Sequence, residues 1–168
     1  DMPWNWPVDL HYLEAKAFCN WKSAKTGKSI RMPTEAEWYH LRGQTTDMDQ
    51  PYWAKAPGNI NLEYEMSPCP VNRHEFKGGF FDIIGNVWQW TETPIDGLEG
   101  YNVHPIYDDF SSPTFDGKHN LFKGGCWIST GNYSIKASRY AFRRHFFQYS
   151  GLRYIEGEEI ENPVMNIY

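Results

Sequence analysis

The stretch Phe81-Asp82-Ile83-Ile84-Gly85-Asn86-Val87-Trp88-Gln89-Trp90-Thr91 decides the fold of this 168-residue chain. Around its centre, two short apolar segments, 80–84 and 87–91, flank the pair Gly85-Asn86. Apolar segments of this length, separated by turn residues, predict two strands with a tight turn between them. Glycine and asparagine tolerate the positive φ that such a turn requires. The centre of the chain therefore predicts sheet structure.

On the N-terminal side of this stretch, the first predicted element is a helix. Asp9 follows Pro7-Val8 as an N-cap, and Gly27 provides a stop. Between them, apolar side chains recur at the spacing of one helix face: Leu10, Leu13, Ala17 and Trp21. This pattern predicts an amphipathic helix.

A second helix follows a short predicted strand at 29–32. Thr34 is its N-cap, and Glu37, three residues later, completes a capping box. The helix ends just before Gly43, which fits the position after a helix end. The next segment, 44–77, is polar and punctuated by proline and glycine, so it predicts an ordered loop.

Three further short strands are predicted on the C-terminal side, at 121–123, 127–129 and 153–155. The pair Gly124-Gly125 separates the first two of them and permits close backbone approach before Trp127. A long connection, 94–118, keeps several aromatic side chains, which indicates a packed and functional loop. Together these elements predict an α+β domain with two N-terminal helices, short strands and much irregular backbone.

The composition excludes several classes of function. The net charge is −5, with 16 basic and 21 acidic residues, whereas a nucleic-acid-binding domain carries a basic footprint. No apolar run approaches the roughly 18 residues of a membrane span. The three cysteines are odd in number and form no CxxC pair, which predicts a reducing, cytoplasmic compartment. We expect neither nucleic acid nor a membrane as a partner.

The two ends of the sequence predict a piece of a larger polypeptide. The chain opens at Asp1-Met2-Pro3 without an initiator methionine and closes in the acidic stretch 156–161. An acidic end of this kind is typical of a linker. We therefore expect a domain at 1–156 and a linker at 157–168.

Three ordered motifs carry a resemblance to a known family. They are Arg31-Met32-Pro33-Thr34-Glu35-Ala36-Glu37-Trp38, the stretch 81–91, and Lys123-Gly124-Gly125-Cys126-Trp127, followed by 139–144 and 150–153. In this order they resemble the formylglycine-generating enzyme and sulfatase-modifying-factor superfamily over about residues 7–156. The resemblance implies a loop-rich, C-type-lectin-like fold with two N-terminal helices and short antiparallel strands.

The cysteines disfavour the copper-dependent branch of this superfamily. Formylglycine-generating enzymes hold copper with two cysteines in their C-terminal part, and here Cys126 is the only cysteine after Cys69. The segments 86–97, 104–110 and 138–147 instead resemble the ergothioneine and ovothiol sulfoxide synthases, and they match the ovothiol branch most closely.

This finer resemblance implies an Fe(II)- and O2-dependent reaction with cysteine and histidine as substrates. The cysteine sulfur is oxidised and bonded to the histidine imidazole, giving a 5-histidylcysteine sulfoxide. The iron-binding histidines of these enzymes lie in a preceding domain, which we expect to be a partner within the same polypeptide and not part of this chain. A methyltransferase domain often follows, and the linker at 157–168 would lead toward it.

Two alternative functions stay open at this point. The ergothioneine branch takes γ-glutamylcysteine as its thiol donor. C-type-lectin-like scaffolds also serve as non-catalytic binding modules, because one fold hosts many functions. A preceding domain with iron ligands favours an enzyme, whereas a receptor stalk or a secretion signal favours a binding module.

Two residues of the long connection are catalytic candidates by resemblance. In the sulfoxide synthases a tyrosine in the loop after the Val-Trp-Gln-Trp strand faces the iron, and Tyr101 matches it. A phenol is a neutral hydrogen-bond and proton donor at neutral pH. His104 stands where the ergothioneine branch has a second tyrosine. The alternative is that Tyr101 is an ordinary packed tyrosine, one of 11 in the chain.

Three arginines are candidates for substrate binding: Arg139, Arg143 and Arg144. Guanidinium groups bind carboxylates bidentately, and both amino-acid substrates carry a carboxylate. By resemblance, Arg143 matches an arginine that holds the thiol substrate. Arg139 stands where the ergothioneine branch has an acidic residue suited to the amino group of a γ-glutamyl substrate. This reversal of charge favours free cysteine as the thiol donor. Alternatively, one or more of the three pair with core acids such as Asp82 or Glu92, and for Arg144 this structural role is favoured.

The sequence predicts no metal site built from this chain alone. Its histidines show no HxxxH or HxH spacing, and Cys19 and Cys126 are predicted to be buried packing residues. Calcium is possible, because related domains bind it near the Gly-Asn-x-Trp turn. Gln89 stands where a glutamate ligand is common, and a neutral amide weakens a site for a hard cation.

Overall fold

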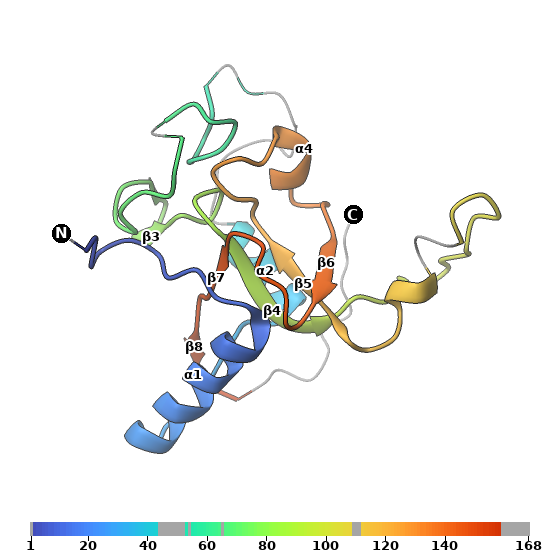
Figure 1. Ribbon diagram of the computed structural model, residues 1–168, viewed down its shortest axis with the longest axis horizontal. Coiled ribbons are helices and arrows are strands. Elements are labelled where there is room, and N and C mark those ends of the chain that lie inside the picture. Colours follow the sequence, from blue (N-terminus) through green and yellow to red (C-terminus); the bar gives the residue numbers. More distant parts are fainter. Residues whose placement is uncertain (1, 44–52, 54, 65, 109–111, 159–168) are drawn as a thin grey trace.

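A four-stranded sheet lies at the centre of the computed structural model, which describes residues 2–43, 53, 55–64, 66–108 and 112–158 (Figure 1). Its strand order is β6-β5-β4-β7. The strands are β4 (Trp88–Pro94), β5 (His119–Lys123), β6 (Tyr140–Arg143) and β7 (Ser150–Gly151). Both β4–β5 and β5–β6 are antiparallel, which agrees with the short antiparallel strands that the resemblance implied, but β4 and β7 run parallel.

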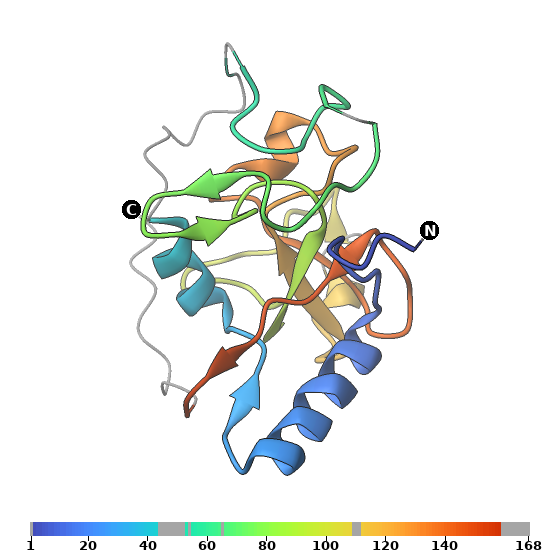
Figure 2. The same cartoon turned by 90° about the vertical axis from the view of Figure 1, so that its left-hand side faces the viewer.

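Two small antiparallel ladders flank this sheet. One joins β1 (Ile30–Arg31) to β8 (Ile155–Glu156) beside the first helix (Figure 2), and the other joins β2 (Glu75–Phe76) to β3 (Phe80–Phe81). The first ladder ties the C-terminal end of the predicted domain 1–156 to the segment that follows the first helix. Of the predicted linker 157–168, only Gly157 and Glu158 belong to the described residues, so the boundary stays a prediction.

The turn between β3 and β4 has the predicted geometry. Gly85 has a φ of 81° and Asn86 a φ of 68°. A Cβ on Gly85 would lie 2.4 Å from the Asn59 oxygen, so only glycine fits there. The Asn86 amide clamps the turn, because its Oδ1 accepts from Cys69 N at 2.9 Å and its Nδ2 donates to Cys69 O at 3.0 Å.

The first helix, α1 (Tyr12–Thr26), has His11 and not Asp9 as its N-cap. Nδ1 of His11 accepts a hydrogen bond from Glu14 N at 3.2 Å, and the Glu14 carboxylate accepts from His11 N at 3.2 Å. Asp9 instead accepts from Ser150 N at 2.9 Å, at the start of β7. The prediction was wrong because a local pattern cannot separate a helix cap from a contact made far along the chain.

The buried face of α1 also differs from the predicted one. Tyr12, Ala15 and Cys19 are buried, whereas Leu13 and Trp21 are 49% and 54% exposed. Both sets have helical spacing. The aromatic core selects Tyr12, whose ring packs edge-on at 5.9 Å from that of Trp90.

The other helix signals are confirmed. The second helix, α2 (Glu35–Arg42), begins with the predicted capping box: Thr34 Oγ1 accepts from Glu37 N at 3.2 Å, and the Glu37 carboxylate accepts from Thr34 N at 2.8 Å. Gly27 ends α1 with a φ of 69°. Gly43 follows α2 as predicted, but it keeps a right-handed φ of −64°.

Three features of the region after β5 differ from the prediction. The predicted strand at 127–129 is a turn, in which Ser129 N donates to Cys126 O at 2.9 Å. A short helix, α4 (Gly131–Ser134), and the edge strand β6 follow it. The strand β6 was not predicted because arginines interrupt its apolar pattern.

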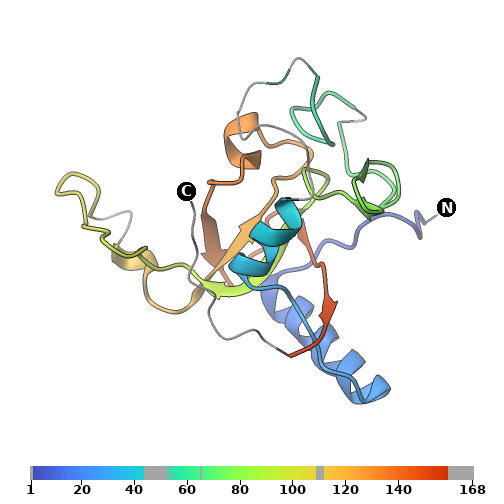
Figure 3. The ribbon, with the colours of Figure 1, turned by 180° about the vertical axis from the view of Figure 1, so that it is seen from behind.

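The two faces of β5 contact different helices. Phe122 packs on Trp90 at a ring distance of 4.9 Å, on the side where α1 lies. Lys123, the next residue, points to the other face, where its Nζ lies 3.5 Å from Glu35 of α2 (Figure 3). Cys19 and Cys126 are buried in the α1-side core, which confirms their predicted packing role.

Candidate functional site

The connection between β4 and β5 extends away from the body of the molecule, on the right of Figure 1. Tyr101 lies in it and is 44% exposed. Its ring packs edge-on against Phe115 at 5.5 Å and lies against Gly97, where a Cβ would come within 2.9 Å of the ring. The ring of Tyr101 is therefore held in place while part of the side chain faces solvent.

His104 also lies in this connection and is exposed. Its Nδ1 accepts from Ile106 N at 3.2 Å, and its ring lies 5.8 Å from that of Tyr107. Neither contact joins it to Tyr101. Asp109 and Phe110, which belong to the segment 104–110, lie outside the described residues.

A cavity of about 300 Å³ opens where this connection leaves the sheet. Its walls are mainly apolar and aromatic, with two of the predicted arginines at the rim. It is lined by Ile95, Thr114, His119, Arg139, Tyr140, Ala141, Phe142, Arg143 and Phe146. Because Thr114 precedes Phe115, the contact partner of Tyr101, the loop and the cavity are on the same side of the molecule.

Arg139 borders this cavity, but its guanidinium is paired with a buried acid. Nε and Nη2 bind the two oxygens of Glu35 at 2.9 and 3.0 Å, and Nη1 donates to Asp96 O at 2.8 Å. Glu35 is 1% exposed and also lies 3.5 Å from the buried Lys123. Arg139 thus neutralises a buried carboxylate, and that acid is Glu35 and not Asp82 or Glu92.

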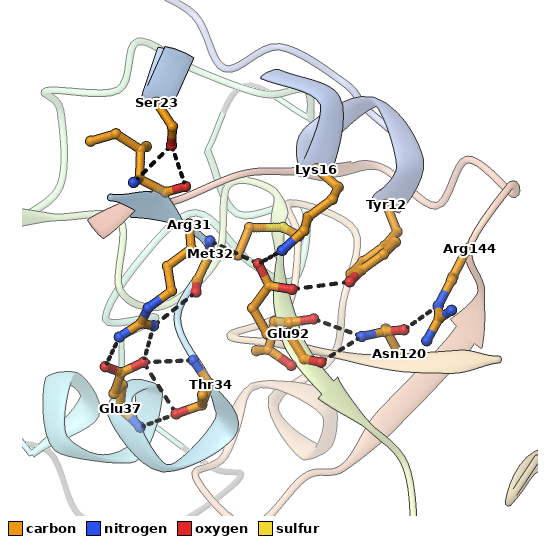
Figure 4. Close-up of polar contacts among 12 residues, drawn as sticks. Tyr12, Lys16, Ser23, Arg31, Met32, Thr34, Glu37, Glu92, Asn120 and Arg144 are labelled. Carbon is orange, nitrogen blue, oxygen red and sulfur yellow. Dashed lines mark hydrogen bonds and ion pairs between the residues drawn. The ribbon is translucent and has the colours of Figure 1, made fainter. Parts of the chain in front are cut away.

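Arg144 holds neighbouring backbone and amide groups. Its Nε donates to Asn120 Oδ1 and its Nη2 to Gly117 O, both at 2.7 Å. The guanidinium also lies 5.3 Å from the centre of the Tyr12 ring. Figure 4 shows this chain of contacts continuing through Asn120 to the backbone of Glu92. These contacts agree with the structural role favoured for Arg144.

The acid at the centre of Figure 4 is already satisfied by other partners. The Glu92 carboxylate accepts from Lys16 Nζ at 2.8 Å, from the Tyr12 hydroxyl at 3.1 Å and from Met32 N at 3.3 Å. Burial and the nearby Glu92 charge raise the pKa of Tyr12 to about 12. None of the three predicted arginines pairs with the Glu92 carboxylate.

Arg143 differs from the other two arginines. It is exposed at the end of β6, and its guanidinium has no hydrogen-bond or ion-pair partner in the described part of the chain. It borders the apolar cavity and also a second one of about 460 Å³. Among the three predicted arginines, Arg143 alone keeps its fork of donors available for an anion.

The second cavity contains residues that the sequence did not single out as a site. It is lined by Leu13, Asp116, Lys118, His119, Arg143, Arg144 and His145. His119 was considered only for metal spacing, yet its Nδ1 lies 2.8 Å from Asp116 Oδ1. The sequence signal that could have indicated this contact is the three-residue spacing in Asp116-Gly117-Lys118-His119. A turn over these residues places the carboxylate of Asp116 next to the imidazole of His119.

Calcium does not fit the position marked by Gln89. Its Nε2 donates to Asp82 O and Ile83 O at 3.1 Å each, and its Oε1 accepts from Arg153 Nε at 3.0 Å. Arg153 Nη2 also donates to Phe81 O at 2.6 Å. Nitrogen donors and a guanidinium charge thus occupy the oxygens that a hard cation requires.

Iron is the second metal to be compared with the side chains of this chain that could be ligands. Within the described ranges, no group of three His, Cys, Asp or Glu side chains is placed to hold a metal ion.

None of the helices in the described ranges has both the length and the apolar character of a membrane-spanning segment.

The fold and this site define an α+β, C-type-lectin-like domain with a loop-bordered cavity. Residues 3–156 match the family of the sulfatase-modifying factor enzyme 1-like domain, and the chain belongs to this family. The solved structure of Treponema denticola variable protein 1 has a TM-score of 0.73 at 18% identity, covering 92% of this chain and 72% of that one. This similarity shows the fold alone.

Enzymes are among the curated relatives. Hercynine oxygenase of Mycobacterium tuberculosis is 29% identical over 138 residues, which cover 76% of this chain and 31% of that protein. The formylglycine-generating enzyme of Mus musculus is 30% identical over 154 residues, covering 79% of this chain and 38% of that protein. The chain therefore spans about a third of the length of each relative.

Proposed function

We propose that this chain is the thiol-substrate-binding part of a non-haem Fe(II)- and O2-dependent sulfoxide synthase. It would join cysteine to histidine and form a 5-histidylcysteine sulfoxide, the reaction of ovothiol biosynthesis. The observation that carries the proposal is the available guanidinium of Arg143, which borders a cavity at the base of the Tyr101 loop. Similarity to an oxygenase in the same family supports the type of reaction.

The overall reaction balances with O2 as the oxidant. The thiol loses its proton, the imidazole loses one C–H, and a new S–C bond forms between them. One oxygen atom ends in the sulfoxide and the other in water, so O2 accepts four electrons. Iron, held by another domain of the same polypeptide, would activate O2. We place that polypeptide in the cytoplasm.

In this proposal Arg143 binds the carboxylate of the thiol substrate. A guanidinium fork forms two parallel hydrogen bonds to a carboxylate, which fixes orientation as well as position. The aromatic walls of the apolar cavity, Tyr140, Phe142 and Phe146, exclude water beside it. The substrate sulfur would then be held toward the mouth of the cavity, where the other domain approaches.

Tyr101 is proposed as the hydrogen-bond or proton donor during oxidation. Its contacts with Gly97 and Phe115 fix the ring without burying it. A fixed donor needs no reorganisation during the reaction, which is the basis of electrostatic preorganisation. His104 is a second candidate in the same loop, and its exposed ring makes only local contacts.

Arg139 is proposed as a positioning residue. Its ion pair with Glu35 fixes the start of β6, and Arg143 ends the same strand. An arginine at 139 still favours free cysteine over γ-glutamylcysteine, because the carboxylate that lies there, that of Glu35, is already paired with the Arg139 guanidinium and is not available to an extra ammonium group. The ergothioneine-type reaction is the second candidate, and similarity to Ergothioneine biosynthesis protein 1 of Schizosaccharomyces pombe favours it.

The test uses the full-length polypeptide that contains this chain, loaded with Fe(II). Histidine is incubated under O2 with cysteine, with γ-glutamylcysteine or with both in equal amounts, and products are identified by mass spectrometry. We expect 5-histidylcysteine sulfoxide from cysteine and its excess in the competition. Preference for γ-glutamylcysteine would support the ergothioneine type, and substrate binding without any coupled product would support a binding module.

A further inference from the structure

The second cavity is lined mainly by basic side chains. They are Lys118, His119, Arg143, Arg144 and His145, and the other two lining residues are Leu13 and Asp116. It is named the cationic cavity below. Positive charge next to a thiol favours the thiolate over the neutral form. This surface therefore suits a group that becomes an anion.

Asp116 fixes the imidazole of His119 in one tautomer. Oδ1 of Asp116 accepts from Lys118 N at 2.7 Å and lies 2.8 Å from Nδ1 of His119. The hydrogen bond with His119 holds the pKa of Asp116 below its ordinary value, so the carboxylate is ionised at neutral pH. An ionised carboxylate only accepts hydrogen bonds. Nδ1 of His119 therefore carries the ring proton.

Nε2 of the neutral ring is then an acceptor. It makes no hydrogen bond with any residue that the structure describes, and the His119 side chain is only 11% exposed. The ring borders both the cationic cavity and the apolar one. The turn before it is fixed as well, because Arg144 Nη2 donates to Gly117 O at 2.7 Å. A fixed imidazole with one available acceptor is the arrangement of a general base.

His119 lies within reach of the substrate that Arg143 is proposed to bind. The two residues are directly opposite in the register of β5 and β6. Opposite residues of an antiparallel pair project from the same face of the sheet, with Cβ atoms about 4.5–5.5 Å apart. In cysteine, only Cα and Cβ separate the carboxylate from the sulfur. A cysteine whose carboxylate is bound by Arg143 can therefore place its thiol at the His119 imidazole.

We propose that His119 is the general base that removes the thiol proton of the cysteine substrate, with Asp116 as its positioning residue. Nε2 takes the proton, and the electron pair of the S–H bond stays on sulfur. The thiolate forms beside the cations of the cavity, and Asp116 stabilises the imidazolium. A thiol has an ordinary pKa of about 8.5, so at neutral pH most of it needs a base. The inference rests on the proposed function in one respect, namely that cysteine is the substrate.

The charged and titratable groups around the imidazole come from the turn before β5 and from β6 with its flanks. They are Asp116, Lys118, Arg139, Arg143, Arg144 and His145. Helix α1 contributes only Leu13 to the lining of the two cavities, and Arg139 is paired with Glu35. Among the described lining residues Asp116 is the one carboxylate, so it alone can stabilise the imidazolium directly.

The direct test is NMR of the full-length polypeptide without metal and without O2, labelled with 15N in its histidine rings. His119→Asn identifies the His119 signals. We expect a neutral ring with the proton on Nδ1 at pH 7, and a shift toward imidazolium when cysteine binds. Serine is the matched ligand, since its hydroxyl is not acidic, and it should leave the ring neutral. Asp116→Asn should remove the preference for the Nδ1 proton.

The second test is the pH profile of kcat/KM for cysteine in the full-length, Fe(II)-loaded polypeptide. His119→Asn keeps an amide N–H for Asp116 but has no base. Since general base catalysis contributes typically 10²–10⁴-fold, kcat/KM should fall about 100-fold at pH 7. The loss should shrink to a few-fold at pH 9, where the thiol ionises without a base. His40→Asn, an exposed histidine of α2, is the control and should match the wild type.

Two results would overturn the inference. One is an equal imidazolium fraction with cysteine and with serine. The other is a loss in His119→Asn that is absent at pH 7, or that is the same at pH 7 and pH 9, as a purely structural role would give. If cysteine alone protonates His119 but the iron-loaded polypeptide forms no coupled product, thiol activation stands and the proposed function fails.

Discussion

Arg143 lies directly opposite His119 in the antiparallel register of β6 and β5, and both residues border the same two cavities. His119 is 9% exposed and is fixed by Asp116. Arg143 is exposed, and within the described residues its guanidinium has no partner. At this edge of the sheet, the fixed imidazole of His119 thus lies beside the unpaired guanidinium of Arg143. The strand β6 positions Arg143, the proposed substrate-binding residue.

Replacing Tyr101 with Phe should reduce sulfoxide formation. The substitution removes the hydroxyl but keeps the ring contact with Phe115. General acid catalysis contributes typically 10²–10⁴-fold, so we expect a fall of at least about ten-fold in kcat and a larger share of simple thiol oxidation products. Tyr107→Phe, an exposed tyrosine of the same loop, is the matched control. A ratio of sulfoxide to simple thiol oxidation products identical to that of the wild-type enzyme would reject the role of Tyr101.

Replacing Arg139 with Ala should destabilise the fold. Glu35 is 1% exposed and would keep only Lys123, at 3.5 Å, as a cationic partner. Breaking a buried ion pair costs about 3–5 kcal/mol, and the remaining lysine should reduce this to about 2 kcal/mol in the free energy of unfolding measured with urea.

The same experiment contains its own controls. Arg143→Ala should change the free energy of unfolding by less than about 0.5 kcal/mol, because its side chain is exposed. In a double-mutant cycle, Glu35→Gln should remove most of the cost of Arg139→Ala. Equal losses for Arg139→Ala with and without Glu35→Gln would contradict the assigned ion pair.

Asp82 predicts a pH dependence of stability. Burial raises the pKa of its carboxyl from 3.8 to about 7, against the opposing effects of Asn86 and Arg153. Between about pH 4 and pH 7 the folded chain then holds a proton that the unfolded chain has lost. Stability therefore falls as pH rises through this window, by at most about 1.4 kcal/mol per pH unit.

Asp82→Asn should remove this contribution. The measurement is the free energy of unfolding from pH 4 to pH 8 for both proteins. The difference between the two curves gives the pH-dependent contribution of Asp82 to stability. We expect the variant to gain stability relative to the unchanged chain as pH rises toward 8. A constant difference across the range would show that Asp82 titrates normally.

The sequence predicted those parts of the fold that depend on neighbouring residues. The Thr34–Glu37 capping box and the Gly85-Asn86 turn are set by contacts or dihedrals within a few positions. Other parts depend on tertiary packing. These are the pairing of β4 with β7 and the ion pair between Arg139 and Glu35, two residues that are 104 positions apart. No local pattern carries that information.

The candidate site was predictable to a similar extent. Arginines at 139, 143 and 144 were found as a group, but their separate roles depend on distant partners such as Glu35, Gly117 and Asn120. The cationic cavity was missed because Leu13, Asp116 and Arg143 come together only after β5, β6 and α1 pack. Tyr101 and His104 remain predictions as catalytic residues.

The central claim is that Arg143 binds the carboxylate of the thiol substrate. It is tested most directly by the KM for cysteine of the full-length, Fe(II)-loaded polypeptide carrying Arg143→Ala, with Arg143→Lys and Lys25→Ala as comparisons. A charged hydrogen bond contributes about 1.5–3 kcal/mol, so KM should rise about 10- to 150-fold in Arg143→Ala. It should rise less in Arg143→Lys, which keeps the charge but loses the fork, and stay constant in Lys25→Ala. An unchanged KM for cysteine in Arg143→Ala would contradict the account.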